Sequence, residues 1–287
     1  MREQTIITER TESERFDIVI EAARVEKNYW RDLWRYRELF YFLAWRDILV
    51  RYKQTVIGIV WALIRPFLTM LIFTFVFNKI AKLSAPGSAP YPLFVFAAML
   101  PWQFFSTALN DASNSLIGNA NLISKVYFPR LIVPASSVIT SFVDFLITVG
   151  LMALMMAWYG FLPDWRVLTL PLFIALAFGS AFGSGLWLCA LNARYRDFRF
   201  IIPFIVQFGL YISPVGFSSN VVPQHLQLLY NCNPIVGVID GFRWSLLRGK
   251  SPLTGSAIIT SIIVTTLLCV SGVRYFRSTE KTFADEI

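Results

Sequence analysis

The 287-residue sequence has few of the residue types on which catalysis and metal binding depend. It holds a single histidine, His225, and three cysteines, Cys189, Cys232 and Cys269, which are far apart along the chain. This spacing indicates neither a disulfide framework nor a metal site. The sequence also contains no HExxH, no GxSxG and no pair of Asp-rich motifs. We therefore expect no catalytic residue and no metal ligand.

A nucleotide-binding loop is lacking as well. The GxxxxGK[ST] motif needs its first glycine to form the phosphate-binding turn. Residues 248–252 read RGKSP, but Trp244 stands where that glycine is required. The sequence thus predicts a chain that binds no cofactor of its own, so that any active process would draw its energy from a partner.

Charged residues are scarce, at 15%, whereas long apolar runs are plentiful. Hydrophobic residues make up 56% of the chain, and the mean hydropathy is +0.56. Soluble domains contain about 45–50% apolar residues, and a helix of about 20 apolar residues crosses a bilayer. We expect an all-α integral membrane protein with six transmembrane helices, at about 56–79, 93–117, 131–159, 168–192, 200–218 and 255–276.

The positive charges indicate the orientation of these spans. Of the 26 Lys and Arg residues, 19 lie on one side of the expected spans and 6 on the other, with Arg65 inside a span. Because Lys- and Arg-rich loops stay in the cytoplasm, we expect both termini there. The charges follow the loops rather than one binding face, so we expect no nucleic-acid partner despite the net charge of +8.

The chain divides into four expected parts. These are a polar N-terminal segment, an amphipathic interfacial helix, a six-span membrane domain and a cytoplasmic tail, at 1–28, 29–54, 55–280 and 281–287.

In the second part, aromatic residues recur at steps of three and four, which places them on one helical face. A basic helix rich in aromatics is typical of the membrane interface. Packing on the cytoplasmic ends of the spans is the alternative.

Two loops have features beyond simple connections. Between the second and third spans we expect a short helix at about 120–127, with Ile123, Tyr127 and Phe128 among the apolar side chains that it shows to the cytoplasm. Such a set on a loop favours docking of a partner, and a helix folded back onto the bilayer is the alternative.

On the outer side, 222–230 and 233–249 are too short to span, and we expect re-entrant or interfacial half-helices between spans five and six.

Arg65 and Pro66 lie well inside the first apolar run. An arginine near the bilayer centre costs about 2.5 kcal/mol or more. We therefore expect Arg65 to face a channel entrance or a dimer interface, with Asp111 as a partner, or to snorkel toward the headgroups. Pro66 is expected to bend the span.

Four stretches of the sequence resemble the permease subunit of ABC type-2 exporters of lipid-linked polysaccharides. They are YRELFYFLAWRDILVRYKQTVIGIVWALIRPFL (36–68), NLISKVYFPRLIVP (121–134), LNARYRDFRFIIPF (191–204) and LYNCNPIVGVIDGFRWSLL (229–247). The resemblance covers about residues 30–280 with its spacing preserved.

The resemblance implies a channel-forming subunit of an ATP-driven exporter in the bacterial inner membrane. The substrate would be a polyprenyl-pyrophosphate-linked glycan of the O-antigen or capsule type, which belongs to lipopolysaccharide biosynthesis. The implied partners are a second copy of the chain and two ATPase subunits, which would carry ATP and Mg. Export of teichoic acid, a drug or a small lipid is the alternative, and a membrane enzyme acting on polyprenyl-linked sugars is a further one.

The resemblance also implies roles for particular residues. The loop that couples to the ATPase would contain Asn119, Asn121, Leu122, Ile123, Lys125, Tyr127, Phe128 and Arg130. The interface helix at the substrate entrance would contribute Trp30, Trp34, Arg37, Tyr41, Trp45 and Arg51. Our channel candidates are Arg65, Phe73, Phe77, Trp102, Phe105 and Asp111.

Overall fold

The computed structural model describes residues 29–53, 56–195, 197–280 and 283. The expected N-terminal segment 1–28 and most of the expected tail lie outside the described residues. Within the described ranges all regular structure is helical and no strand occurs. The expected all-α class is confirmed for this part of the chain.

Five helical segments among the described residues are long and apolar enough to cross a bilayer. They correspond to the expected first, second, third, fourth and sixth spans. They are Leu63–Ile80 within α3 (Val56–Phe73) and the π-helix η1 (Thr74–Ile80), α4 (Tyr91–Gly118), α6 (Ile132–Trp158), the 3-10 helix η2 (Trp165–Thr169) with α7 (Leu170–Arg194), and α11 (Gly255–Thr279).

The fifth expected span, 200–218, does not form one long helix. Helix α8 covers only Phe198–Ile212, 15 residues, or about 22 Å at 1.5 Å per residue. The hydrocarbon core is about 30 Å thick. The helix ends because Pro214 disfavours a helical conformation in the residue before it, and Ser213 is extended with ψ 150°. Six full-length spans are therefore not confirmed.

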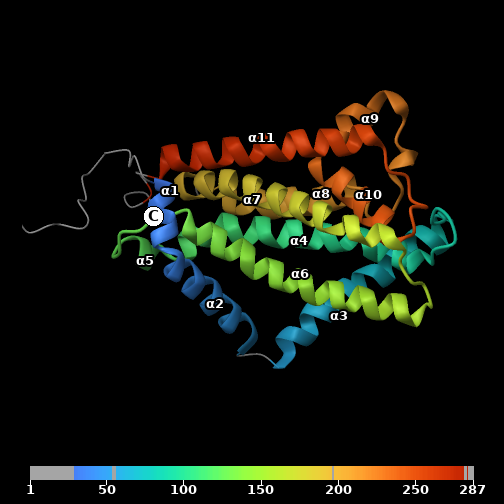
Figure 1. Ribbon diagram of the computed structural model, residues 1–287, viewed down its shortest axis with the longest axis horizontal. Coiled ribbons are helices and arrows are strands. Elements are labelled where there is room, and N and C mark those ends of the chain that lie inside the picture. The colour runs from blue at the N-terminus through green and yellow to red at the C-terminus, as the bar shows by residue number, and fades with distance from the viewer. Residues whose placement is uncertain (1–28, 54–55, 196, 281–282, 284–287) are drawn as a thin grey trace, which may run out of the picture.

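Helix α4 forms the centre of the bundle. Figure 1 shows it between α6 and α7, with α11 beyond α7, and α2 (Arg37–Lys53) and α3 on the opposite side. The interior around α4 is apolar, and Phe104 packs there against Phe142, Phe145 and Phe178 with ring centroids 5.4–6.2 Å apart. Close packing of these rings helps to hold the core of the bundle together.

Helices α7 and α11 approach each other closely because glycines face the contact. A Cβ added to Gly183 would lie 2.6 Å from the backbone nitrogen of Cys269, and one added to Gly272 would lie 2.5 Å from the carbonyl oxygen of Gly183. Small residues that let helix backbones meet are typical of helix pairs in membranes.

The segment before α11 forms two short helices, α9 (Gln224–Asn231) and α10 (Pro234–Leu246), at the end of the bundle away from α1 (Tyr29–Arg35) (Figure 1). Helix α10 is buried against α4, α7 and α11, whereas the leucines of α9 are largely exposed. The two helices match the expected half-helices in position. Their depth in a bilayer stays a prediction.

Arg243 on α10 is fully buried. Its guanidinium donates to the carbonyl oxygens of Phe94 (3.1 Å), Val215 (2.8 Å) and Phe217 (2.8 Å) and lies 3.6 Å from the centroid of the Phe94 ring. Burial lowers the pKa of Arg243 to about 10, so it stays charged at neutral pH. One side chain thus joins α10 to the start of α4 and to the chain after α8.

Candidate functional site

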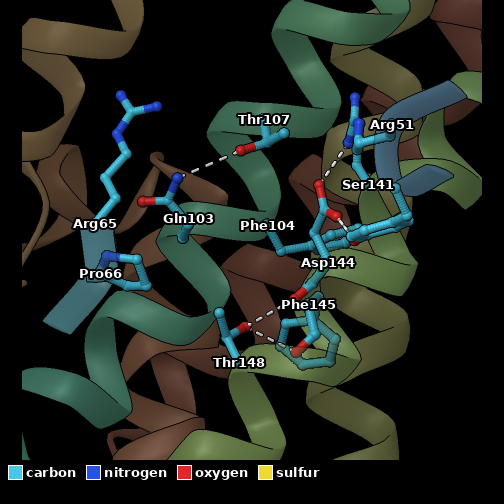
Figure 2. A pocket seen from close by; sticks show the side chains of 11 residues that line it. Arg51, Arg65, Pro66, Gln103, Phe104, Thr107, Ser141, Asp144, Phe145 and Thr148 are labelled. Carbon is cyan, nitrogen blue, oxygen red and sulfur yellow. Dashed lines mark hydrogen bonds and ion pairs between the residues drawn. The ribbon is translucent and has the colours of Figure 1, made fainter. Parts of the chain in front are cut away.

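A cavity of about 220 Å³ lies between α2, α3, α4 and α6. Figure 2 shows its lining, with Arg65 and Pro66 from α3 on one side, Gln103 and Thr107 from α4 between, and Asp144 from α6 on the other side. Polar and charged groups are costly inside a bilayer and mark functional paths there. This cavity is therefore the candidate functional site.

Arg51, in the last turn of α2, is held by two carboxylates. Its Nη1 lies 2.5 Å from Oδ2 of Asp144 on α6, and its Nη2 lies 2.7 Å from Oδ2 of Asp111 on α4. The Tyr52 hydroxyl donates to Oδ1 of Asp144, and Ser141 Oγ donates to Oδ2 of Asp111 at 2.8 Å. We call these five residues the Arg51 clamp, and it ties the end of α2 to the bundle.

Electrostatics favour the charged form of this arginine. Burial alone lowers the pKa of the Arg51 guanidinium, but Asp111 and Asp144 outweigh burial, and the net effect raises the pKa above its ordinary value. The clamp carries one positive and two negative charges. The formal net charge of these five residues is therefore −1. Arg65, which also lines the cavity, is not part of the clamp.

The clamp lies at an intermediate depth. Asp111 stands seven residues before the end of α4, about 10 Å along the helix, and Asp144 stands twelve residues after the start of α6, about 18 Å along. Both distances are measured from the end of the bundle that the charge bias assigns to the cytoplasm. The clamp and its cavity would thus lie in the inner half of the bilayer.

Arg65 does not pair with Asp111, which corrects the expected ion pair. Figure 2 shows its guanidinium pointing away from the Arg51 clamp, on the far side of Gln103 and Thr107. Asp111 is engaged by Arg51 instead, because the packing of α2 against α6 brings Arg51 between the two acids. Arg65 is exposed and makes no ion pair within the described part of the chain, and Pro66 beside it is buried.

The expected channel aromatics pack around α8 and the chain that follows it. Phe73 and Phe77 lie 5.5 Å apart between ring centroids, and Phe77 covers Gly216. Trp102 is buried against Gly209, and its ring lies 5.9 Å from that of Phe105. The structure thus brings these four aromatics to the side of the bundle where α8 lies. Their place in a channel stays a prediction.

The expected interface helix is divided into α1 and α2, one face of which packs on the bundle, while its place in the membrane interface stays a prediction. Tyr29, Leu43 and Ala44 are buried against the bundle. The opposite face is exposed and aromatic, and it consists of Trp30, Trp34, Tyr41 and Trp45. Tyr41 stacks on Trp45, and the Arg37 guanidinium lies 5.8 Å from the centroid of the Trp34 ring.

The loop between α4 and α6 differs in part from expectation. Its helix α5 covers only Ala120–Ile123. Ile123 and Phe128 are buried, at 5% and 4% exposure, rather than shown to the cytoplasm. They pack into an apolar cluster with Leu116 and Phe276. The loop is fixed at both ends by the hydrogen bonds described next, and this lets the two side chains turn inward.

The remaining loop residues are partly exposed and partly anchored by hydrogen bonds. Asn121, Lys125 and Tyr127 are exposed, and Leu122 is half-buried. Asn119 accepts a hydrogen bond from Arg46 of α2 at 2.8 Å.

At the other end of the loop, the backbone N–H of Arg130 donates to Glu280 Oε1 at 2.6 Å. The loop is thus joined at one end to α2 and at the other to the end of α11.

The sequence-based site candidates do not include Arg243 of α10 or three residues of the clamp, Tyr52, Ser141 and Asp144. One signal for Asp144 was available, since it is an acid inside an apolar run. The pairing of Asp144 with Arg51 depends on the packing of α2 on α6. The periodicity of apolar residues in the sequence does not predict which helices pack together. Among the described residues no group of three or more His, Cys, Asp or Glu side chains could hold a metal ion.

Comparisons with known proteins find related sequences over most of the chain. The family model for the ABC-2 type transporter matches residues 38–247. The O-antigen export system permease protein RfbA of Myxococcus xanthus is 25% identical over 259 residues, 90% of this chain and 98% of that protein. The protein of the same name from Klebsiella pneumoniae is 27% identical over 252 residues, 86% of this chain and 94% of that protein. The chain belongs to the ABC-2 type transporter membrane family.

Proposed function

We propose that the chain is the channel-forming subunit of an ATP-driven exporter that moves lipid-linked polysaccharide of the O-antigen or capsule type across the inner membrane. Its relatives are named as O-antigen export permeases. The observation that carries the proposal within this chain is the cavity that Arg51 and Arg65 line beside an aromatic helix.

The chemistry of the cavity suits the carrier end of such a substrate. Arginine binds phosphate oxygens through paired N–H groups, and Arg65 is exposed at the cavity. The neighbouring α1 and α2 present Trp and Tyr side chains of the kind that lie at headgroup depth. A polyprenyl pyrophosphate would thus enter from the inner leaflet with its anionic group at Arg65.

The energy source would be a separate ATPase subunit, with two copies bound to a dimer of this chain. The exposed residues of the loop between α4 and α6, Asn121, Lys125 and Tyr127, would contact it. Motion taken up there would reach α2 through the hydrogen bond of Asn119 with Arg46, and α11 through the contact of Arg130 with Glu280.

Arg65→Ala tests the proposal. Because its side chain is exposed, the variant should fold and assemble as the wild type does, while export of the glycan falls about tenfold or more through loss of a charge-assisted contact to phosphate. Export is measured as surface glycan in cells that lack the native gene, with membrane abundance and ATPase co-purification in parallel. Arg65→Lys should retain part of the activity, and full export by Arg65→Ala would remove this role.

A further inference from the structure

A second groove lies on helix α11, on the far side of the bundle from the Arg51 clamp. Figure 1 shows α11 at the edge of the bundle, separated from α2 and α3 by α7 and α4. The groove has a volume of about 500 Å³, and all the residues that line it belong to the C-terminal half of α11. It therefore opens away from the bundle. The lining consists of Leu267, Val270, Ser271, Arg274, Tyr275 and Ser278.

The lining changes from apolar to polar along the helix. Leu267 and Val270 are exposed and lie nearer the middle of α11. Arg274 and Ser278 are exposed as well and lie near its end. Leu267 is about 18 Å from the end of the helix along its axis, and Arg274 is about 8 Å from it. Because the charge bias assigns this end to the cytoplasm, the apolar part would lie among acyl chains and Arg274 near the head groups of the inner leaflet.

Arg274 carries a positive charge that no acid of its own helix balances. Helices α7 and α11 contain no Asp or Glu, and Arg274 forms no ion pair with any residue that the structure describes. Glu280, just after the helix, is engaged by Arg130. Arg277 in the last turn adds a second positive charge. An anion thus complements this end of the groove, and a guanidinium holds phosphate oxygens through paired N–H groups.

The packing of α11 on α7 fixes part of the groove. Trp187 on α7 stacks on Tyr275, with ring centroids 4.2 Å apart and planes 13° from parallel. The indole N–H of Trp187 also donates to Ser271 Oγ at 2.9 Å. Two lining side chains are therefore held in place before a ligand arrives, which lowers the entropic cost of binding.

We propose that this groove binds one anionic phospholipid of the inner leaflet, with its phosphate at Arg274 and an acyl chain along Leu267 and Val270. Ser278 narrows the class of head group. Its hydroxyl donates to the carbonyl oxygen of Tyr275 at 2.7 Å, so its oxygen is left to accept a hydrogen bond from a ligand. Phosphatidylglycerol meets both requirements, because it joins one negative phosphodiester to hydroxyl donors. The lipid is a bound component of the protein and not its cargo, since the groove and the candidate entrance lie on opposite sides of the bundle.

Native mass spectrometry of the full chain in detergent tests the site. The chain is titrated with dioleoyl phosphatidylglycerol or with dioleoyl phosphatidylcholine, which has the same chains and no net charge. The wild type should retain one phosphatidylglycerol with an apparent affinity about tenfold or more above that for phosphatidylcholine, the size of one charge-assisted hydrogen bond. Arg274→Gln should remove this preference without unfolding the chain, because the side chain is exposed. Equal retention of the two lipids by the wild type overturns the proposal.

Arg199→Gln is the matched control. Arg199 is an exposed arginine in the first turn of α8, at the same end of the bundle, and it does not line the groove. Its replacement should leave the preference unchanged. An equal effect of the two substitutions would show a general attraction of anionic lipid to cytoplasmic arginines and overturn the site. Val270→Trp fills the apolar part without changing a charge and should weaken retention of both lipids severalfold.

A phosphatidylglycerol with a photoreactive acyl chain locates the bound lipid. The adduct should map to residues 255–279, and adducts confined to other helices would contradict the proposal. Glycerol 1-phosphate, which has the phosphate but no chains, should not displace the lipid at equal concentration, and displacement would assign the groove to a soluble phosphate instead. None of these outcomes bears on the proposed export function, which is tested separately at Arg65.

Discussion

At the scale of single residues, the molecule places its arginines in three different situations. Arg243 is fully buried and satisfied by backbone carbonyls, Arg51 is half-buried between two acids, and Arg65 is exposed at the cavity. A buried charge is tolerated only where fixed dipoles or opposite charges replace water. The same residue type is therefore structural in one place and available to a ligand in another.

Arg243→Met tests the structural role. Three carbonyl oxygens would lose their donor inside the protein, at about 1–3 kcal/mol for each unsatisfied group, so the free energy of unfolding should fall by about 3 kcal/mol or more. Thermal unfolding in detergent measures the effect. Arg248→Met is the control, since Arg248 is exposed and bonds one carbonyl, that of Leu162, at 2.7 Å. It should cost about 1 kcal/mol or less, and equal losses in the two variants would contradict this account.

At the scale of elements, the bundle depends on how closely its helices approach. Helices α7 and α11 meet at Gly183 and Gly272, where no Cβ fits without movement of backbone atoms. Between helices already in lipid, close van der Waals packing replaces the hydrophobic effect as the main attraction. The glycines are thus required by the contact rather than by helix propensity, which they lower.

Gly183→Ala should force α7 and α11 apart and lower the free energy of unfolding by about 1–3 kcal/mol, the usual cost of overpacking. Gly150→Ala is the matched control in α6, where an added Cβ meets nothing within 4 Å. That change should be neutral or stabilise by up to about 1 kcal/mol, because alanine favours helix over glycine. Midpoints of thermal unfolding for the two variants should shift in opposite directions or by clearly different amounts.

At the scale of the whole molecule, the two ends of the bundle differ in character. One end carries α1, α5 and the end of α11, and the other carries α9 and α10 (Figure 1). The charge bias assigns the first end to the cytoplasm. The native cysteines offer a direct test, since Cys232, after α9, is exposed while Cys189 is buried.

A membrane-impermeant maleimide should label Cys232 in intact spheroplasts of a variant that keeps only this cysteine. A cysteine placed at the exposed Lys125, between α4 and α6, should react only after the membrane is opened. Labelling is read from the mass shift of the purified chain. The reverse pattern would show that the termini lie outside the cytoplasm.

Much of the helical framework could be predicted from the sequence, because burial in lipid requires long apolar runs. The runs near 93–117, 131–159 and 255–276 each became one long helix. The run at 200–218 did not, although Pro214 stood in it as a local signal. The inward turn of Ile123 and Phe128 carried no such signal, since their burial comes from the cluster that other helices provide.

The sequence by itself determined the helical class, the apolar segments and, through its matching stretches, the membership in the ABC-2 transporter family. These follow from composition and order along one chain. Only the tertiary structure decided that Arg51 rather than Arg65 binds Asp111, and that Asp144 joins them. The physical reason is that an ion pair depends on the distance between side chains of different helices, and the packing of α2 on α6 sets that distance.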